Sequence, residues 1–220
     1  MNNKTEQIWD DVWQTGASGR FITALRLYYN TLLGRLILPH ISAEGTSLEL
    51  GCGTAQLSLM IAPHIKEVTG LDISSEGLAI AEREKNKRNI HNARFVKADV
   101  QQVPFDHVFD VVWSAGLIEH FFDKDIEIVR QHLKATKPGG VAIMSVPYAY
   151  SLHSLHYGLT RPVFTRRFWP WSQERYFQKF YSVQTLRKLG KAVGKPFKVY
   201  FLRPWFLGLL MGIIVLEIKN

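Results

Sequence analysis

Four side chains able to bind polar groups or to move a proton follow short apolar segments of this 220-residue chain. Asp72 and Asp99 each end such a segment, and Glu119 and His120 follow another. A carboxylate there can accept hydrogen bonds from ligand hydroxyl or amino groups, and an imidazole titrates near neutral pH. These residue types predict a binding site for a polar ligand with a proton acceptor beside it.

A glycine turn precedes all four residues. Gly51 and Gly53 close the apolar segment 46–51, and Cys52 stands between them. Glycines remove Cβ atoms where the backbone turns sharply, and they let a ligand lie against bare peptide. We expect a helix to begin directly after the turn, capped by Thr54 and with unpaired N–H groups at its start. Cys52 is expected to be a small buried residue rather than a nucleophile.

Apolar segments alternate with helical patterns from residue 46 onward. The expected strands are 46–51, 67–72, 93–97, 109–114, 141–146, 197–202 and 213–218. The expected helices are 5–14, 20–40, 54–63, 75–89, 122–135 and 182–193. Strands separated by helices of this length pair in parallel with right-handed crossovers, and such open sheets bind ligands beyond the carboxyl ends of their strands.

The acid and the glycines form the pattern Glu49-x-Gly51-x-Gly53-x-Ala55. This pattern resembles motif I of the class I S-adenosylmethionine-dependent methyltransferases, with Ala55 at the site of the third glycine. The dinucleotide pattern G-x-G-x-x-G would need a glycine at position 56, where Gln56 stands. An NAD-dependent oxidoreductase is therefore disfavoured.

Three further segments resemble motifs of the same family, in the family's order: 70–74, 95–100 and 133–143. The resemblance implies a Rossmann-like three-layer α/β sandwich, whose mostly parallel seven-stranded sheet ends in an antiparallel strand. It also implies S-adenosylmethionine as the cofactor. Helices would precede the core, and an insertion rich in aromatic and basic residues would follow the fifth strand.

The resemblance assigns cofactor contacts residue by residue. Asp72 would hold the ribose hydroxyls, Ile73 would press on the adenine, Asp99 would accept from the adenine amino group, and Val100 would cover the ring. The complete predicted cofactor set is Glu49, Gly51, Cys52, Gly53, Asp72, Ile73, Asp99, Val100 and Ser114. Both aspartates could instead serve only as caps of loop ends.

Glu119 and His120 are similar to the Glu-His pair of O-methylating members of the family, and we predict them as the catalytic residues. His120 would take a proton from a hydroxyl acceptor. The alternative is a pair that merely packs. We predict no metal site, although His153 and His156 could join this pair as ligands of a divalent ion.

The charge of +8 is unevenly distributed. Residues 151–220 hold 12 Lys and Arg but only two acidic residues, whereas residues 1–150 are slightly acidic. Such an excess suggests an anionic partner, which could be a group on the acceptor, nucleic acid or a membrane surface. One cysteine and a polar N-terminal segment predict a cytoplasmic protein.

One domain is expected, with four parts. A helical cap covers 1–45, the cofactor-binding core 46–147, an insertion 148–181, and a helix with a strand hairpin 182–220. The insertion could form a lid over an amphipathic or anionic acceptor, grip RNA, or simply pack. The apolar run 205–216 is too short to span a bilayer, so a buried hairpin is expected and an interfacial anchor stays open.

The predicted function is methyl transfer from S-adenosylmethionine to a small or lipid-like acceptor, with O-methylation as one form of it. Two alternatives stay open. One is an RNA methyltransferase that uses the basic last third, and the other is a non-catalytic S-adenosylmethionine-binding subunit that supports a partner. The acceptor and the oligomeric state are not encoded in any motif of the chain.

Overall fold

The computed structural model describes residues 3–14, 20–121, 123–152, 154, 179–202 and 212–220. The helices are α1 (Asn3–Gln14), α2 (Arg20–Ile37), α3 (Gln56–Ile61), α4 (Ser75–Lys87), α5 (Asp125–Ala135) and α8 (Val183–Ala192). The strands are β1 (Thr46–Leu50), β2 (Glu67–Asp72), β3 (Ala93–Lys97), β4 (Phe109–Ala115), β5 (Thr136–Pro147), β6 (Phe197–Phe201) and β7 (Ile213–Lys219). All the helices and strands expected from the sequence are present, with shifted ends.

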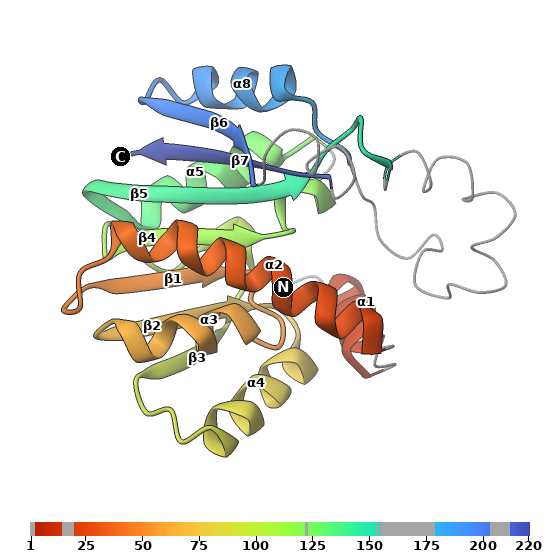
Figure 1. The fold of residues 1–220 in the computed structure, drawn as a ribbon, viewed down its shortest axis with the longest axis vertical. Coiled ribbons are helices and arrows are strands. Elements are labelled where there is room, and N and C mark those ends of the chain that lie inside the picture. The colour runs from red at the N-terminus through yellow and green to blue at the C-terminus, as the bar shows by residue number, and fades with distance from the viewer. Residues whose placement is uncertain (1–2, 15–19, 122, 153, 155–178, 203–211) are drawn as a thin grey trace, which may run out of the picture.

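The seven strands form one sheet in the order β3-β2-β1-β4-β5-β7-β6. Strands β1 to β5 pair in parallel, and β7 runs antiparallel to both of its neighbours. The predicted mostly parallel sheet with an antiparallel last strand is confirmed. The arrows of β1 and β4 point to the edge of the sheet beside which α1 lies (Figure 1).

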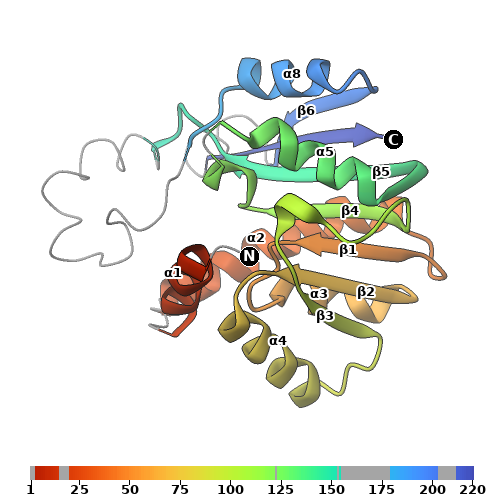
Figure 2. The same cartoon turned by 180° about the vertical axis from the view of Figure 1, so that it is seen from behind.

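Each face of the sheet carries its own hydrophobic core. One core packs Leu48, Val112 and their neighbours against Ile128 of α5 and Leu186 of α8. The other packs Val111, Trp113 and their neighbours against α2 and α3. Figure 2 shows α5 on the face opposite to α2 and α3. Because successive strand residues point to opposite faces, this division also decides which strand residues can reach which helix.

The start of α3 differs from the sequence prediction. Ala55 is its N-cap residue, in the left-handed conformation with φ 53°, and no side chain caps the helix there. The prediction that Thr54 caps this helix is therefore wrong. Ala55 occupies the site of the family's third glycine and adopts the positive φ that glycine tolerates best, so its methyl group costs about 1 kcal/mol of backbone strain.

Strand β5 begins at Thr136, earlier than the predicted start at residue 141. Phe109 pairs with Thr136 and Val111 with Val141, so the strand has a bulge between these pairs. Gly139 lies in it with φ 82°. A bulge lets a strand continue past residues that cannot all pair with the neighbouring strand. From the glycines alone, this segment had been predicted to be a turn before the strand.

Both ends of the predicted insertion are described, and its middle lies outside the described residues. The two ends meet, since Tyr181 N donates to Pro147 O (2.9 Å) and Ala149 N donates to Tyr181 O (2.9 Å). The residues that would form a lid, grip RNA or simply pack lie mostly outside the described part of 148–181. Most of the apolar run 205–216 also lies outside it. No described helix has the length and apolarity needed to cross a bilayer.

Candidate active site

A cavity of about 540 Å³ lies at the carboxyl ends of the central strands. Its lining residues come from α1, from α2 and from the turns that follow β1, β2, β3 and β4. This volume lies within the range of roughly 300–1,000 Å³ that is typical of small-molecule sites. Among the predicted site residues, the following line it: Glu49, Gly51, Cys52, Asp72, Ile73, Asp99, Val100 and His120.

Asp72 ties the glycine turn to the end of β2. Its Oδ2 accepts from Gly53 N (2.7 Å) and its Oδ1 accepts from Ser74 N (2.8 Å). Burial raises the pKa of this carboxyl above its usual value, and the backbone N–H groups oppose the shift. Each carboxylate oxygen has a further lone pair. Asp72 can therefore hold the turn and still accept a hydrogen bond from a ligand hydroxyl group.

Asp99 similarly shapes the turn after β3. Its Oδ1 accepts from Gln101 N (2.9 Å) at the start of the 3-10 turn η3 (Val100–Gln102). Ile73 and Val100 line the cavity next to the two aspartates. A flat ring placed between these apolar side chains could present its polar edge to Asp99, which is the contact that the motif resemblance implies.

Glu49 lies almost fully buried under the glycine turn, at 4% exposure. Its Oε2 accepts from Ser58 N (3.1 Å) and Ser58 Oγ (2.6 Å), so it binds one of the amide groups at the start of α3. Burial raises the pKa of Glu49 to about 7. Cys52 beside it is buried, and burial raises the pKa of its thiol as well, which disfavours a nucleophilic thiolate.

The amide groups of the glycine turn are used by the protein itself. Gly51 N and Cys52 N both donate to Leu71 O (2.7 and 3.1 Å), and Gly53 N donates to Asp72. These three amide groups are therefore already paired within the protein. The turn offers a ligand a surface without side chains, and the hydrogen-bond acceptors come from the aspartates.

Helix α1 contributes Trp9 and Trp13 to the lining of the cavity. A Cβ added to Gly53 would lie 2.3 Å from Trp13 Cζ2, and one added to Gly77 would lie 3.0 Å from Trp13 Cδ1. The indole of Trp13 therefore rests on two glycines. The amphipathic pattern of residues 5–14 was the available signal, but it could not say which surface the helix covers.

His120 ends the 3-10 turn η4 (Ile118–His120), directly after β4, and lines the cavity. Its imidazole meets the indole of Trp9 edge to face, with ring centroids 4.9 Å apart and an interplanar angle of 71°. The predicted proton acceptor and helix α1 thus meet at the lining of the cavity.

Ser114 does not line the cavity. It lies on the α5 face of β4, where its Oγ is 2.9 Å from His132 Nε2. His132 Nδ1 donates to Ile128 O (2.8 Å), so Nε2 carries no proton and accepts from Ser114. Burial lowers the pKa of His132 to about 4, and the pair stays neutral. The strand alternation explains why Ser114 points into the core, so its predicted cofactor contact is not formed by its hydroxyl group.

Glu119 also lies outside the cavity lining, although its neighbour His120 lines it. The carboxyl is buried, its Oε2 has no hydrogen-bond partner among the described residues, and burial raises its pKa to about 8. Lys179 N donates to its backbone oxygen (2.9 Å). Successive residues of a 3-10 turn point in different directions, so the two predicted catalytic residues are not brought together.

No three histidine, cysteine, aspartate or glutamate residues of the described ranges form a group suited to a metal ion. His153 and His156, which could have joined Glu119 and His120, lie outside these ranges. Charged residues that line the cavity are Glu49, Asp72 and Asp99, all acidic.

Comparison with known proteins agrees with this arrangement. A methyltransferase domain profile matches residues 48–140. Demethylmenaquinone methyltransferase of Geobacillus stearothermophilus is 28% identical over 118 residues, which are 50% of each chain. The probable S-adenosylmethionine-dependent methyltransferase CRG1 of Saccharomyces cerevisiae is 32% identical over 112 residues, 47% of this chain and 38% of that one. The matched region thus spans about half the length of these relatives.

Solved structures share the fold over nearly the whole chain. The complex of DhpI with SAH superposes with a TM-score of 0.70 at 20% identity and covers 100% of this chain and 98% of that one. A possible histamine N-methyltransferase from Thermotoga maritima gives 0.67 at 19% identity, over 98% of this chain and 99% of that one. At these identities the likeness establishes the fold.

Proposed function

We propose that this chain, which is a class I S-adenosylmethionine-dependent methyltransferase by its fold and by the domain at residues 48–140, transfers a methyl group to a small-molecule or lipid-like acceptor. The observation that carries the proposal is one cavity that brings together two kinds of group. Its lining includes Asp72, Asp99 and residues of the glycine turn, and it also includes His120.

The residues at the ends of β2 and β3 fit S-adenosylmethionine. Asp72 would accept from the ribose hydroxyls and Asp99 from the adenine amino group, while Ile73 and Val100 would cover the ring. The carboxyl groups of Asp72 and Asp99, with no lysine or arginine among the described lining residues, suit a cationic molecule. When bound, the sulfonium group supplies an already electrophilic methyl group.

The protein then mainly has to position the acceptor, and orientation alone can supply roughly 7–11 kcal/mol. His120 would take the proton of an acceptor hydroxyl and release it to water afterwards. O-methylation follows if the acceptor presents such a group. Relatives named demethylmenaquinone methyltransferase support a small acceptor that carries a ring.

To test this, the protein is incubated with S-adenosylmethionine that carries a labelled methyl group, separately with each fraction of a cell extract. Label should enter the polar small-molecule or the lipid fraction, and His120→Gln should reduce its transfer. Label confined to RNA or protein would contradict the proposal.

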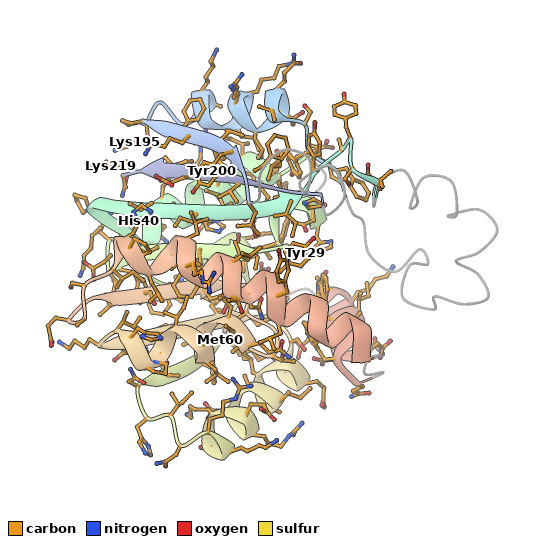
Figure 3. The ribbon with its side chains drawn as sticks, viewed as in Figure 1. Tyr29, His40, Met60, Lys195, Tyr200 and Lys219 are labelled. Carbon is orange, nitrogen blue, oxygen red and sulfur yellow. The ribbon has the colours of Figure 1, made fainter. Side chains whose placement is uncertain are left out.

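An RNA methyltransferase remains the second candidate, because exposed basic residues gather on α8, on the loop after it and on β6: Arg187, Lys188, Lys191, Lys195 and Lys198. Lys195 and Lys219 lie at the end of the sheet away from α1 (Figure 3). Binding to tRNA with sub-micromolar affinity and a steep salt dependence would favour this candidate. A non-catalytic subunit would bind cofactor and release no S-adenosylhomocysteine with any fraction.

A further inference from the structure

The turn that carries His120 is held from outside through two of its backbone carbonyl groups. Lys179 N donates to Glu119 O (2.9 Å). The Tyr181 hydroxyl group donates to Ile118 O (3.2 Å). These carbonyl groups belong to the two residues that precede His120 in η4. A displacement of either donor would therefore displace the backbone that carries the imidazole.

The turn itself is a short 3-10 turn. His120 N donates to Leu117 O (3.1 Å), and Phe121 N donates to Ile118 O (3.2 Å). Hydrogen bonds of a 3-10 turn have poorer geometry than those of an α-helix, and a single turn leaves carbonyl groups for other partners. The position of η4 thus depends on the groups that pack against it.

The Tyr181 hydroxyl group also joins the turn to α5. It lies 3.2 Å from Asp125 Oδ2, in the first turn of that helix. Tyr181 is fully buried, and burial raises the pKa of its phenol above the usual value, so the hydroxyl group keeps its proton and can donate. Lys179 Nζ forms an ion pair with the same Asp125 oxygen (2.7 Å). The carboxylate thus holds the hydroxyl group and the ammonium group at one point beside η4.

Tyr181 is itself fixed to the sheet. Its N–H group donates to Pro147 O (2.9 Å) at the end of β5, and its backbone oxygen accepts from Ala149 N (2.9 Å). Its ring packs into the core on the α5 face, together with Ile118 and Ile128. Because the backbone and the ring of Tyr181 are both held, its hydroxyl group can transmit the position of the sheet to η4.

Resting on the proposed function, we propose that Tyr181 is a positioning residue for methyl transfer, whose hydroxyl group, held by Asp125, fixes the turn that keeps the His120 imidazole at the cavity. Tyr181 does not line the cavity, so it would touch neither the cofactor nor the acceptor. Its loss should slow the proton removal by His120 and leave cofactor binding intact. A reacting group that is misplaced by about 1 Å can cost as much as about a hundredfold in rate.

The test variant is Tyr181→Phe, which keeps the packed ring and removes only the hydroxyl group. The two acceptors that it leaves keep other partners, since Ile118 O still accepts from Phe121 N and Asp125 still pairs with Lys179. The variant should therefore fold, and urea unfolding checks this.

Tyr200→Phe is the matched control. The Tyr200 hydroxyl group also donates to a carboxylate, Glu217 Oε2 (2.7 Å). Tyr200 lies on β6 and packs against the core on the other face of the sheet (Figure 3). The control thus removes the same kind of hydrogen bond without touching η4.

Each protein is compared in three measurements. Calorimetry gives the affinity for S-adenosylhomocysteine. NMR follows the ring signals of His120, which are assigned with His120→Gln. The rate of transfer is that of labelled methyl from S-adenosylmethionine to the extract fraction that takes up label with the wild-type protein. The rate is also measured for Tyr181→Phe combined with His120→Gln.

Tyr181→Phe should slow the transfer about tenfold and leave the affinity for S-adenosylhomocysteine unchanged. The His120 ring signals should move, because the imidazole meets the indole of Trp9 and the ring-current effect of the indole falls off steeply with distance. Tyr200→Phe should change none of the three. In the His120→Gln background, Tyr181→Phe should cause no further slowing, since a residue that acts through another has no separate effect once that other is removed.

A merely structural role would slow the transfer equally in both backgrounds, and that result would overturn the inference. Unmoved His120 signals in Tyr181→Phe would overturn it as well. If His120→Gln slows the transfer but Tyr181→Phe does not, this inference alone is wrong. If no small-molecule or lipid fraction takes up label, or His120→Gln transfers it as fast as the wild type, the proposed function loses its acceptor or its base, and this inference is wrong with it.

Discussion

Asp72 shows how a single residue can serve the fold and the ligand together. Its two oxygens accept from Gly53 N and Ser74 N, which fixes the turn that faces the cavity. The sequence suggested either a ribose contact or a loop cap, and the structure shows the cap while leaving lone pairs for the sugar. The two interpretations are thus compatible.

Asp72→Asn tests the ribose contact. The amide keeps the shape but removes the charge and one acceptor, so S-adenosylmethionine should bind about tenfold more weakly in calorimetry. Asp106→Asn, on an exposed residue, is the control and should bind normally. An unchanged affinity in Asp72→Asn, with the urea unfolding curve also unchanged, would show that this carboxylate does not meet the ligand.

Glu119 gives a pH-dependent prediction. Its pKa rises from 4.5 to about 8 on folding, because burial disfavours the charged form. The folded state therefore keeps a proton that the unfolded chain loses, and this group's contribution to stability falls as pH rises from about 4.5 to about 8. Glu119→Gln should match the wild type near pH 4.5 and exceed it at higher pH, by up to about 1.4 kcal/mol per pH unit.

The measurement for Glu119→Gln is urea unfolding at several pH values, with Glu127→Gln on the exposed side of α5 as the control. The control should show no such trend relative to the wild type. A stability difference for Glu119→Gln that stays constant from acid to alkaline pH would contradict a buried protonated carboxyl.

At the scale of elements, the position of α1 depends on Gly53 and Gly77, because the indole of Trp13 packs against both of them. Gly53→Ala would place a methyl group on Trp13 and force a left-handed alanine, at φ 50°. Gly139→Ala is the matched control, because Gly139 also has a positive φ but nothing lies within 4 Å of its added Cβ. Both should lose about 1 kcal/mol to backbone strain, and Gly53→Ala should also release α1.

Hydrogen exchange of the α1 amide groups measures that release. Gly53→Ala should lose protection in residues 3–14 and weaken S-adenosylmethionine binding, whereas Gly139→Ala should do neither. If α1 stays equally protected in Gly53→Ala, the helix does not rest on the glycine turn in the way described.

The elements were largely predictable, and their contacts were not. Ser182 opens the helical pattern 182–193 with a residue type that favours N-caps, and in the structure its Oγ accepts from Thr185 N (3.1 Å). Local patterns carry such information because capping and alternation act over a few residues. They could not place Trp9 on His120, since that contact depends on how a whole helix docks. The motif order also did not show that the Ser114 hydroxyl group faces His132 of α5, which strand alternation decides.

At the scale of the molecule, the sheet brings turns from distant parts of the sequence to one edge, and α1 closes them into a cavity. The acidic groups lie at this edge, while Lys195 and Lys219 lie at the opposite one (Figure 3). These two lysines of the basic last third therefore do not take part in the site. Any anionic partner of those lysines would bind away from the reacting groups.

The most direct test is a crystal of the protein soaked in S-adenosylhomocysteine. We expect density for the adenosyl group against the Gly51–Gly53 turn, with the ribose hydroxyls on Asp72, the adenine between Ile73 and Val100, and the sulfur facing His120. An empty cavity at saturating ligand, or the ligand bound elsewhere on the molecule, would contradict it.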